Sequence, residues 1–241
     1  MASALSNSNH DRRSRTAPTI RSRLALLAFA CNAFVAGVAA AWLLRRRAPR
    51  AWNAVVETVG PSALTLAAAI AVVATAGSLY LSEVAHFVPC KLCWYQRIGM
   101  YPLAVILVVA AIRKDTRVWP YPLTLAALAF PISIYHVLLE HFPSLETGAC
   151  DINNPCSIVW VRHFGVVTIP YMAASGFAAI AVAMALAARW QKENDNVHQP
   201  VQEPQTHSEG AARAEETAQP RLRNDRRRGR AGGGRRDRVA T

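Results

Sequence analysis

The sequence predicts an all-α membrane protein: a four-helix transmembrane bundle with one extra N-terminal hydrophobic helix and a disordered basic tail. The chain of 241 residues is 52% hydrophobic, yet its formal net charge is +12. The apolar and the charged residues are separated along the chain, as in membrane segments flanked by basic loops. Four of the five cysteines form two close pairs outside the most apolar segments.

Five apolar stretches carry the helix prediction. They cover approximately residues 24–44, 62–82, 94–112, 119–139 and 166–188. Each is near or above the roughly 18–20 residues that a helix needs to cross about 30 Å of hydrocarbon. Because helices satisfy their own backbone in lipid, we expect all of them to be transmembrane helices. The first is too long for a signal-peptide core and is followed by three arginines, so we expect a retained anchor.

The chain divides into four expected parts. These are a disordered basic N-terminus (1–23), an extra hydrophobic helix (24–44), a four-helix core (62–190) and a disordered arginine-rich tail (191–241). The tail has no aromatic residue and no isoleucine, so it cannot bury enough apolar surface to offset the entropy of ordering. We interpret it as a solvated tail that anionic lipid attracts, and we predict no nucleic-acid partner.

Basic residues predict the orientation. Arginines and lysines are concentrated in 45–50, 113–117 and 189–192, and the intervening loops carry few. By the positive-inside rule these three basic segments face the cytoplasm. The intervening loops, which hold both cysteine pairs, therefore face outward. Arginines before residue 24 conflict with this rule if helix 24–44 spans the membrane. Either the N-terminus lies outside against the rule, or this segment is re-entrant or is threaded differently through the membrane.

Cys90 and Cys93 form a Cys-x-x-Cys motif, which fits half a zinc site, a haem attachment, a redox dithiol or a structural disulfide. Haem attachment needs histidine after the second cysteine, and Trp94 excludes it. A disulfide that closes so short a ring would stabilise almost nothing, because loop-closure entropy grows with loop length. The partial positive charge at a helix N-terminus and the nearby cation Lys91 would both stabilise a cysteine thiolate in this motif. The motif therefore indicates a reactive pair.

The second pair, Cys150 and Cys156, encloses the loop residues Asp-Ile-Asn-Asn-Pro. A static disulfide would be a sufficient explanation for this pair alone. A zinc site that joins both pairs remains an alternative, as does a metal site built with His86 or His136. The third alternative is a membrane anchor whose disulfides are static.

Two polar residues lie at the same expected depth below the outward surface. In a helix, Cys90, Cys93 and Arg97 share one face at i, i+3 and i+7. An intramembrane cation is costly and is by default a functional candidate. His136 lies about as deep on the antiparallel neighbour, so we expect Arg97 and His136 to act at one site. A snorkelling Arg97 and a hydrogen-bonded core histidine are the structural alternatives.

A dithiol, a cation and a histidine at the lipid boundary indicate an electron acceptor dissolved in the membrane. Thiol–disulfide exchange transfers disulfides between proteins without creating new ones. Net disulfide formation therefore needs an electron acceptor that is more oxidising than the dithiols it oxidises. A lipid quinone would reach such a site laterally, and its oxygens gain negative charge on reduction. Arg97 and His136 could stabilise that charge, and His136 could deliver protons.

Three stretches together resemble the DsbB/BdbC family of membrane disulfide-bond-formation oxidoreductases. They are "PCKLCWYQRI", "YHVLLEHFPS" followed by "ACDINNPC", and "FGVVTIPYMA", within about residues 62–190. The short span between the second pair resembles the BdbC type. The family core has four helices, so helix 24–44 and the arginine-rich tail are departures from it.

The resemblance implies a function and its partners. The protein would generate disulfides in the bacterial plasma (inner) membrane by reoxidising a secreted or periplasmic thioredoxin-like thiol oxidase of the DsbA or BdbD kind. Cys150 would form the intermolecular disulfide, and electrons would pass from Cys150/Cys156 to Cys90/Cys93. Cys93 would react with the quinone, which could be ubiquinone or menaquinone. Arg97 and His136 would bind it, and no metal is implied.

Overall fold

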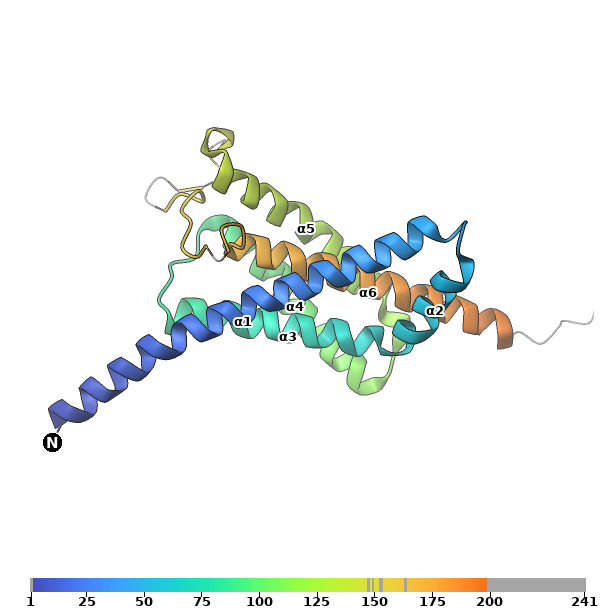
Figure 1. Ribbon diagram of the computed structural model, residues 1–241, viewed down its shortest axis with the longest axis horizontal. Helices are drawn as coiled ribbons and strands as arrows, with labels where there is room; N and C mark the ends of the chain where they lie inside the picture. Colours follow the sequence, from blue (N-terminus) through green and yellow to red (C-terminus); the bar gives the residue numbers. More distant parts are fainter. Residues whose placement is uncertain (1, 147, 149, 152–153, 163, 199–241) are drawn as a thin grey trace, which may run out of the picture. The chain divides into compact units, whose positions relative to one another are not determined.

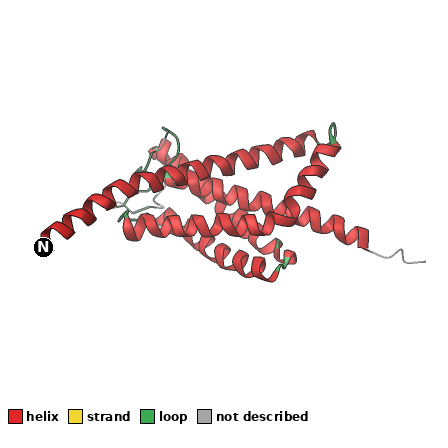
Figure 2. Cartoon of the chain, turned by 60° about the horizontal axis from the view of Figure 1, so that its bottom comes forward, coloured by secondary structure: helices red, strands yellow, loops and turns green. Residues whose placement is uncertain are grey.

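The computed structural model describes residues 2–146, 148, 150–151, 154–162 and 164–198 (Figure 1). The described chain is mainly helical (Figure 2), and its longest connection, residues 142–168 between α5 and α6, contains one isolated bridge between Asp151 and Asn154. Its helices are α1 (Ala2–Leu44), α2 (Pro49–Val59), α3 (Ala63–Leu79), α4 (Lys91–Arg113), α5 (Pro120–His141) and α6 (Ile169–His198). Short 3₁₀ turns cover Gly60–Ser62, Thr116–Val118 and Pro143–Leu145, and a π-helical turn, Tyr80–Val84, extends α3.

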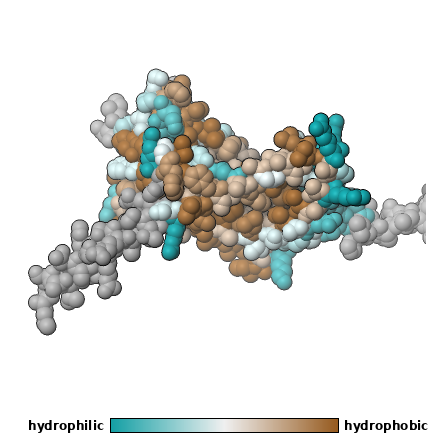
Figure 3. Space-filling view, viewed as in Figure 1, coloured by the Kyte–Doolittle hydropathy of each residue, from teal (hydrophilic) through white to brown (hydrophobic). Residues whose placement is uncertain are grey.

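The all-α membrane prediction is confirmed. Within the described residues, five segments are long and apolar enough to span a membrane, and they correspond to the five predicted stretches. Apolar side chains cover the middle of the visible face, while hydrophilic residues gather toward the helix ends (Figure 3). Residues 199–241, the larger part of the expected disordered tail, lie outside the described residues.

Three helical segments differ from the sequence-based expectation. One is α6, which continues to His198 although residues 191–241 were expected to be disordered. The backbone of α1 is helical from Ala2, although residues 1–23 were expected to be disordered. Hydropathy marks where the apolar part begins, whereas helical hydrogen bonding can propagate beyond it once a helix has nucleated. A further difference is α2, which begins with Pro49 at its first turn and lies between the expected helices 24–44 and 62–82. Proline suits that position because its missing N–H would be unpaired there anyway.

The helix α4, which carries the first cysteine pair, has a defined start and end. Cys90 is its N-cap, and the Cys90 sulfur accepts a hydrogen bond from the backbone N–H of Cys93 at 3.4 Å. The helix ends at Lys114, whose φ of 54° is left-handed and stops helical propagation. Pro102 lies inside α4 and Pro131 inside α5, where each removes a backbone donor.

The core of the bundle is built from small residues that let the helices approach closely. On α3, Ala63, Ala67 and Ala71 repeat every four residues and are fully buried. In lipid the helices gain little from hydrophobic burial, so close van der Waals packing of this kind stabilises their association. Larger side chains such as Phe177 and Leu103 fill the space between helices.

Gly99 marks the closest approach of α4 to α5, and we expect it to tolerate no larger residue. A Cβ atom at Gly99 would lie 2.8 Å from the Cβ of Ala129 and 3.5 Å from the ring of Phe177. Gly99→Ala should therefore destabilise the protein by about 1–3 kcal/mol, the usual cost of overpacking. The measurement is the thermal midpoint in detergent. Gly37→Ala is the matched control, because nothing lies within 4 Å of a Cβ there; an equal loss in both variants would contradict the packing argument.

Both cysteine pairs lie at one end of the bundle, which we call the cysteine end. The N-terminal part of the apolar segment of α1 lies at this same end, because Phe29 contacts the ring of Phe164 and Asn32 bonds to Tyr171. The chain therefore enters α1 at the cysteine end and leaves it at the other, where Arg45 follows (Figure 1). Helix α1 is continuous and its segment Ser22–Leu44 is long and apolar enough to cross a membrane.

Candidate functional site

The start of α4 brings the first cysteine pair together. The sulfurs of Cys90 and Cys93 lie 3.1 Å apart and share a hydrogen bond. Both are free thiols, Cys90 buried and Cys93 half-buried. Because Cys90 caps the helix and Cys93 lies one turn later, their side chains point toward different neighbours. The two sulfurs of the pair therefore have different surroundings.

The second pair forms a disulfide, and the loop that contains it packs against the region of the first pair. Cys150 and Cys156 are joined in the loop after α5, and the Asn154 amide donates to the carbonyl oxygen of Pro89 at 3.2 Å. Cys156 is 1% exposed and packs in one apolar cluster with Cys90, Leu92 and Leu139. The structure therefore brings together the two pairs that the sequence singled out, with Cys90 on the side of Cys156.

His136 lies between the two pairs. Its Nε2 is 3.6 Å from the Cys90 sulfur and 3.1 Å from the carbonyl oxygen of Cys156, and the side chain is 2% exposed. On the other side of the ring, the Gln96 amide nitrogen lies 3.1 Å from Nδ1. When Gln96 donates to Nδ1, the ring carries its proton on Nε2, which then points at Cys156 and Cys90.

Gln96 is a site residue that the sequence analysis missed. It is 6% exposed within a membrane-spanning helix, and its amide orients the ring of His136. An uncharged amide three residues after the second cysteine of the motif was the available signal. Amides are often overlooked in such helices because they cost less to bury than charges do.

The environment of Cys90 favours its thiolate. The hydrogen bond shared with Cys93, assisted by His136, holds the pKa of Cys90 well below its ordinary value, although burial acts in the opposite direction. A lowered pKa keeps the thiolate at neutral pH and so stabilises the reduced pair relative to its disulfide. Perturbed pKa values of this kind are typical of functional sites.

We expect His136→Ala to raise the pKa of Cys90. The thiolate should then be lost on acidification at a higher pH than in the unsubstituted protein, because a stabilising hydrogen bond is removed. The measurement is the ultraviolet thiolate absorbance of the reduced protein against pH, in a Cys31→Ala background. His141→Ala, at an exposed histidine on the same helix, is the control. An unchanged titration in His136→Ala would contradict this assignment.

Arg97 lies in different surroundings from His136. Its guanidinium donates from Nε to the Ser78 hydroxyl and from Nη2 to the Ser78 carbonyl oxygen, both at 3.1 Å, and lies 5.2 Å from the Trp94 ring centroid. Ser78 precedes the π-helical turn at the end of α3. Such turns are frequent at functional sites because they redirect side chains and carbonyls.

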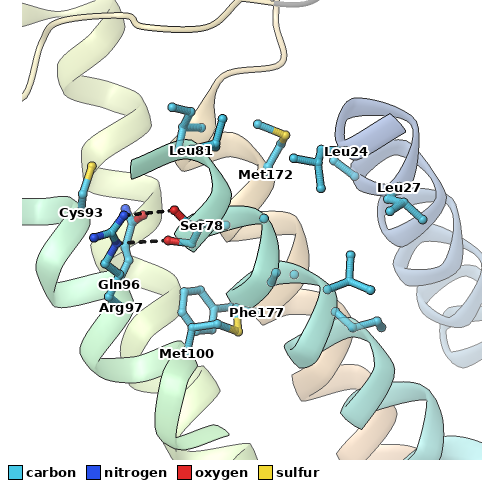
Figure 4. Close-up of a pocket in the computed structure, with 18 of the residues that line it drawn as sticks. Leu24, Leu27, Ser78, Leu81, Cys93, Gln96, Arg97, Met100, Met172 and Phe177 are labelled. Atoms are coloured by element: carbon cyan, nitrogen blue, oxygen red, sulfur yellow. Dashed lines mark hydrogen bonds between the residues drawn. The ribbon is translucent and has the colours of Figure 1, made fainter. Parts of the chain in front are cut away.

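An apolar cavity of about 340 Å³ opens beside Cys93 and Arg97 (Figure 4). Cys93, Gln96, Arg97 and Tyr101 of α4 line one wall, and apolar residues of α1, α3 and α6 line the others. Within the described chain, the Tyr101 hydroxyl is buried without a hydrogen-bond partner. Cys90 and His136 are not among the lining residues, so Cys93 is the sulfur of this pair that faces the cavity.

The same cluster could hold a metal ion. Ligand atoms of Cys90, Cys93 and His136 all lie within 4.8 Å of one another, which is close enough for one ion. Tetrahedral zinc would need a fourth ligand. His86, the other histidine considered from the sequence, is not part of this described group.

Comparison with known proteins places this geometry in a family. The family model for the disulfide bond formation protein DsbB matches residues 61–192, which include all the cysteines of the site. The chain is 44% identical to the probable disulfide formation protein of Oceanobacillus iheyensis over 123 residues, covering 50% of this chain and 85% of that protein. It is also 44% identical to disulfide bond formation protein C of Bacillus subtilis over 118 residues, covering 48% and 86%.

A more distant relative is the SPbeta prophage-derived disulfide bond formation protein B of Bacillus subtilis, 35% identical over 126 residues, which cover 52% of this chain and 84% of the relative. No solved structure matches the chain. The resemblance predicted from the cysteine motifs is thus confirmed by matches that extend across α3 to α6. The chain belongs to the DsbB family of disulfide bond formation proteins, and it is a membrane-spanning thiol oxidoreductase.

Proposed function

We propose that the protein forms disulfides by passing electrons from an extracytoplasmic thioredoxin-like thiol oxidase, through its two cysteine pairs, to a quinone in the bacterial inner membrane. The observation that carries the proposal is the different surroundings of the two neighbouring sulfurs: Cys93 lines the cavity beside Arg97, whereas Cys90 is buried in one apolar cluster with Cys156. The family names of the relatives support the disulfide chemistry.

Electrons enter at the loop pair. A thiolate of the reduced partner attacks Cys150, which is more accessible than the almost fully buried Cys156. The Cys150–Cys156 bond breaks, an intermolecular disulfide forms at Cys150, and Cys156 leaves as a thiolate. The second thiolate of the partner then releases the oxidised partner and leaves Cys150 reduced. One disulfide has been made in the partner and one has been lost from this chain.

The electrons then pass to the α4 pair, starting from the form in which Cys90 and Cys93 are oxidised. The Cys156 thiolate attacks the Cys90 sulfur, with which it shares an apolar cluster. Cys93 leaves as a thiolate that faces the cavity. When the Cys150 thiol subsequently re-forms its bond with Cys156, it loses a proton, which passes to the Cys93 thiolate, and Cys90 is released as a thiolate. His136 and the Cys93 thiol then stabilise the Cys90 thiolate. Gln96 positions His136 for this role.

The cavity residues fit a quinone. The volume of about 340 Å³ and the mainly apolar lining suit an amphipathic ligand of this kind. Arg97 can stabilise negative charge on one carbonyl oxygen, and the unpartnered hydroxyl of Tyr101, one turn away, can donate to a ligand. A bound quinone would supply a two-electron, two-proton acceptor, which would allow Cys90 and Cys93 to become a disulfide again. Ubiquinone and menaquinone both meet these requirements.

The orientation of the site supports an extracytoplasmic partner. The cysteine end lies opposite the helix ends that carry Arg45, Arg113 and Arg189. Basic residues of membrane proteins concentrate on the cytoplasmic side, so the cysteine pairs face the compartment in which disulfides persist.

Trapping the intermolecular disulfide tests the partner half of the proposal. In Cys156→Ser, Cys150 has no internal partner, so a reduced thioredoxin-like oxidase should accumulate as a mixed disulfide with the membrane protein. Cys150→Ser is the matched control and should trap nothing at this position. Failure of Cys156→Ser to trap an oxidase from the same organism would contradict the assigned role of Cys150.

Metal binding by Cys90, Cys93 and His136 is the second candidate function, because their ligand atoms already converge. Elemental analysis of purified protein distinguishes the two. About one zinc or copper ion per chain with unreactive thiols would favour a metal site. Metal-free protein whose thiols react freely would favour the oxidoreductase. Cys93→Ser should abolish binding of added zinc if the metal proposal holds.

A further inference from the structure

The helix α1 lies outside the matched family region, residues 61–192, yet it forms part of the cavity. Leu24, Leu27, Ala28 and Cys31 contribute its lining. Figure 4 shows Leu24 and Leu27 across the cavity from Cys93 and Arg97, with α3 and α6 between the two walls. A four-helix core would lack this wall, so in this chain the extra helix changes the boundary of the site.

The packing of α1 explains how it can reach the cavity. Ala25 is fully buried and Ala28 is 5% exposed, so small residues on one face let α1 approach the bundle. Gly77 of α3 is part of this contact, because a Cβ atom there would lie 3.1 Å from the Leu24 side chain. Even so, only 11% of the most apolar window of α1 is buried, compared with 56% in α6. The helix is peripheral and touches the bundle mainly along this seam.

A polar contact fixes α1 over α6. The Asn32 amide donates both its hydrogens, to the Tyr171 hydroxyl at 2.9 Å and to the Ser175 hydroxyl at 3.0 Å. Ser175 in turn donates to the backbone carbonyl oxygen of Tyr171 at 2.9 Å. An amide within an apolar helix is costly to leave unpaired, so this contact specifies which face of α1 meets the bundle. The cavity residues Met172 and Gly176 lie on the same stretch of α6.

The chemistry of the two walls differs. The α4 wall offers a thiol, an amide, a guanidinium and a hydroxyl, whereas the α1 wall offers two leucines, an alanine and a cysteine. A ligand that spans them needs a polar, redox-active head group and an apolar extension. Because lipid is itself apolar, transfer of that extension from lipid gains little hydrophobic free energy. Shape and van der Waals contact with α1 would then select the ligand.

We propose that α1 is the binding wall for the isoprenoid tail of the quinone, and that Leu24, Leu27, Ala28 and Cys31 determine which quinones the protein accepts. The inference rests on the proposed quinone-linked function. It assigns the extra helix a role in substrate binding, distinct from that of a membrane anchor. A phospholipid acyl chain in this space is the competing occupant, and the experiments below distinguish the two.

A pair of matched substitutions tests the wall. Ala28→Trp fills the cavity side of α1, whereas Ala30→Trp places the same group on an exposed position of the same helix. Ala28→Trp should raise the KM for a long-tailed quinone about tenfold or more, equivalent to the lower range of overpacking costs. It should affect a tailless quinone less. Ala30→Trp should leave both KM values unchanged. Equal KM values in Ala28→Trp and the unsubstituted protein would overturn the proposal.

Cys31 supplies a second test that needs no bulky substitution. When Cys90 and Cys93 form one disulfide and Cys150 and Cys156 form the other, Cys31 is the one thiol left among the five cysteines. A long-tailed quinone should slow its alkylation by a membrane-permeant maleimide, and a tailless quinone should not. Cys31→Ala identifies background labelling. Alkylation at the same rate with and without long-tailed quinone would overturn the proposal and indicate a lipid chain. Absence of any quinone reduction by the unsubstituted protein would instead reject the proposed function itself.

Discussion

Cys93→Ser is expected to abolish quinone reduction completely. Cys93 is the sulfur of its pair that faces the cavity, and Cys90 alone can neither reach the acceptor nor re-form an internal disulfide. Electrons should therefore stop at the loop pair. The measurement is the steady-state rate of quinone reduction with a reduced thioredoxin-like oxidase, in membranes that contain the variant at wild-type abundance.

The same variant should retain one partial reaction. Its Cys150–Cys156 disulfide remains intact and should oxidise a substoichiometric amount of the partner in a single turnover. His141→Ala, at an exposed residue that does not line the cavity, is the control and should still support multiple turnovers. Undiminished steady-state turnover in Cys93→Ser would remove the proposed electron path.

Arg97→Met is expected to lower the rate of quinone reduction by about 10²–10³-fold, the usual effect of removing one group that stabilises a developing oxyanion. Methionine keeps much of the apolar volume and removes the charge. The expected loss belongs to the acceptor step, so single-turnover oxidation of the partner should be unaffected. The measurement separates the two by stopped-flow mixing, first without quinone and then with it.

Two further variants separate the charge of Arg97 from its structural contacts. Ser78→Ala removes the hydroxyl that Arg97 Nε bonds but keeps the cation, so it should reduce the rate far less than Arg97→Met. Arg97→Lys keeps a charge but loses the planar fork, and we expect an intermediate rate. Equal losses in Ser78→Ala and Arg97→Met would indicate that Arg97 only joins α4 to α3.

The transmembrane segments could be predicted because the requirement that determines them is local. A run of apolar residues must be helical in lipid whatever surrounds it, so length and hydropathy located all five. The segment Pro49–Val59 was missed because its apolar residues are confined to one face of the helix, so that it forms no continuous apolar run. The start of α1 at Ala2 was missed because hydropathy does not report helical propagation into polar sequence.

The site was predictable to the level of residue type but not of orientation. Cysteine spacing and an intramembrane arginine are chemically unusual enough to stand out in one sequence. Arg97 and His136 were predicted to act at one site because both lie at the same expected depth in the membrane. Equal depth does not show that two side chains point toward each other. In the structure Arg97 lines the cavity, whereas His136 is buried among Cys90, Gln96 and Cys156. Their rotation about the helix axes depends on packing between helices, which the spacing of residues did not reveal.

The most direct test of the account measures electron stoichiometry across the membrane boundary. Purified protein in lipid nanodiscs receives a known amount of reduced thioredoxin-like oxidase and excess quinone under anaerobic conditions. Disulfide in the oxidase and reduced quinone are then both quantified. We predict one molecule of quinone reduced for each disulfide formed. With Cys93→Ser we predict no reduced quinone, and no disulfide in the oxidase beyond the first turnover. Disulfide formation that proceeds without reduction of quinone would contradict the account.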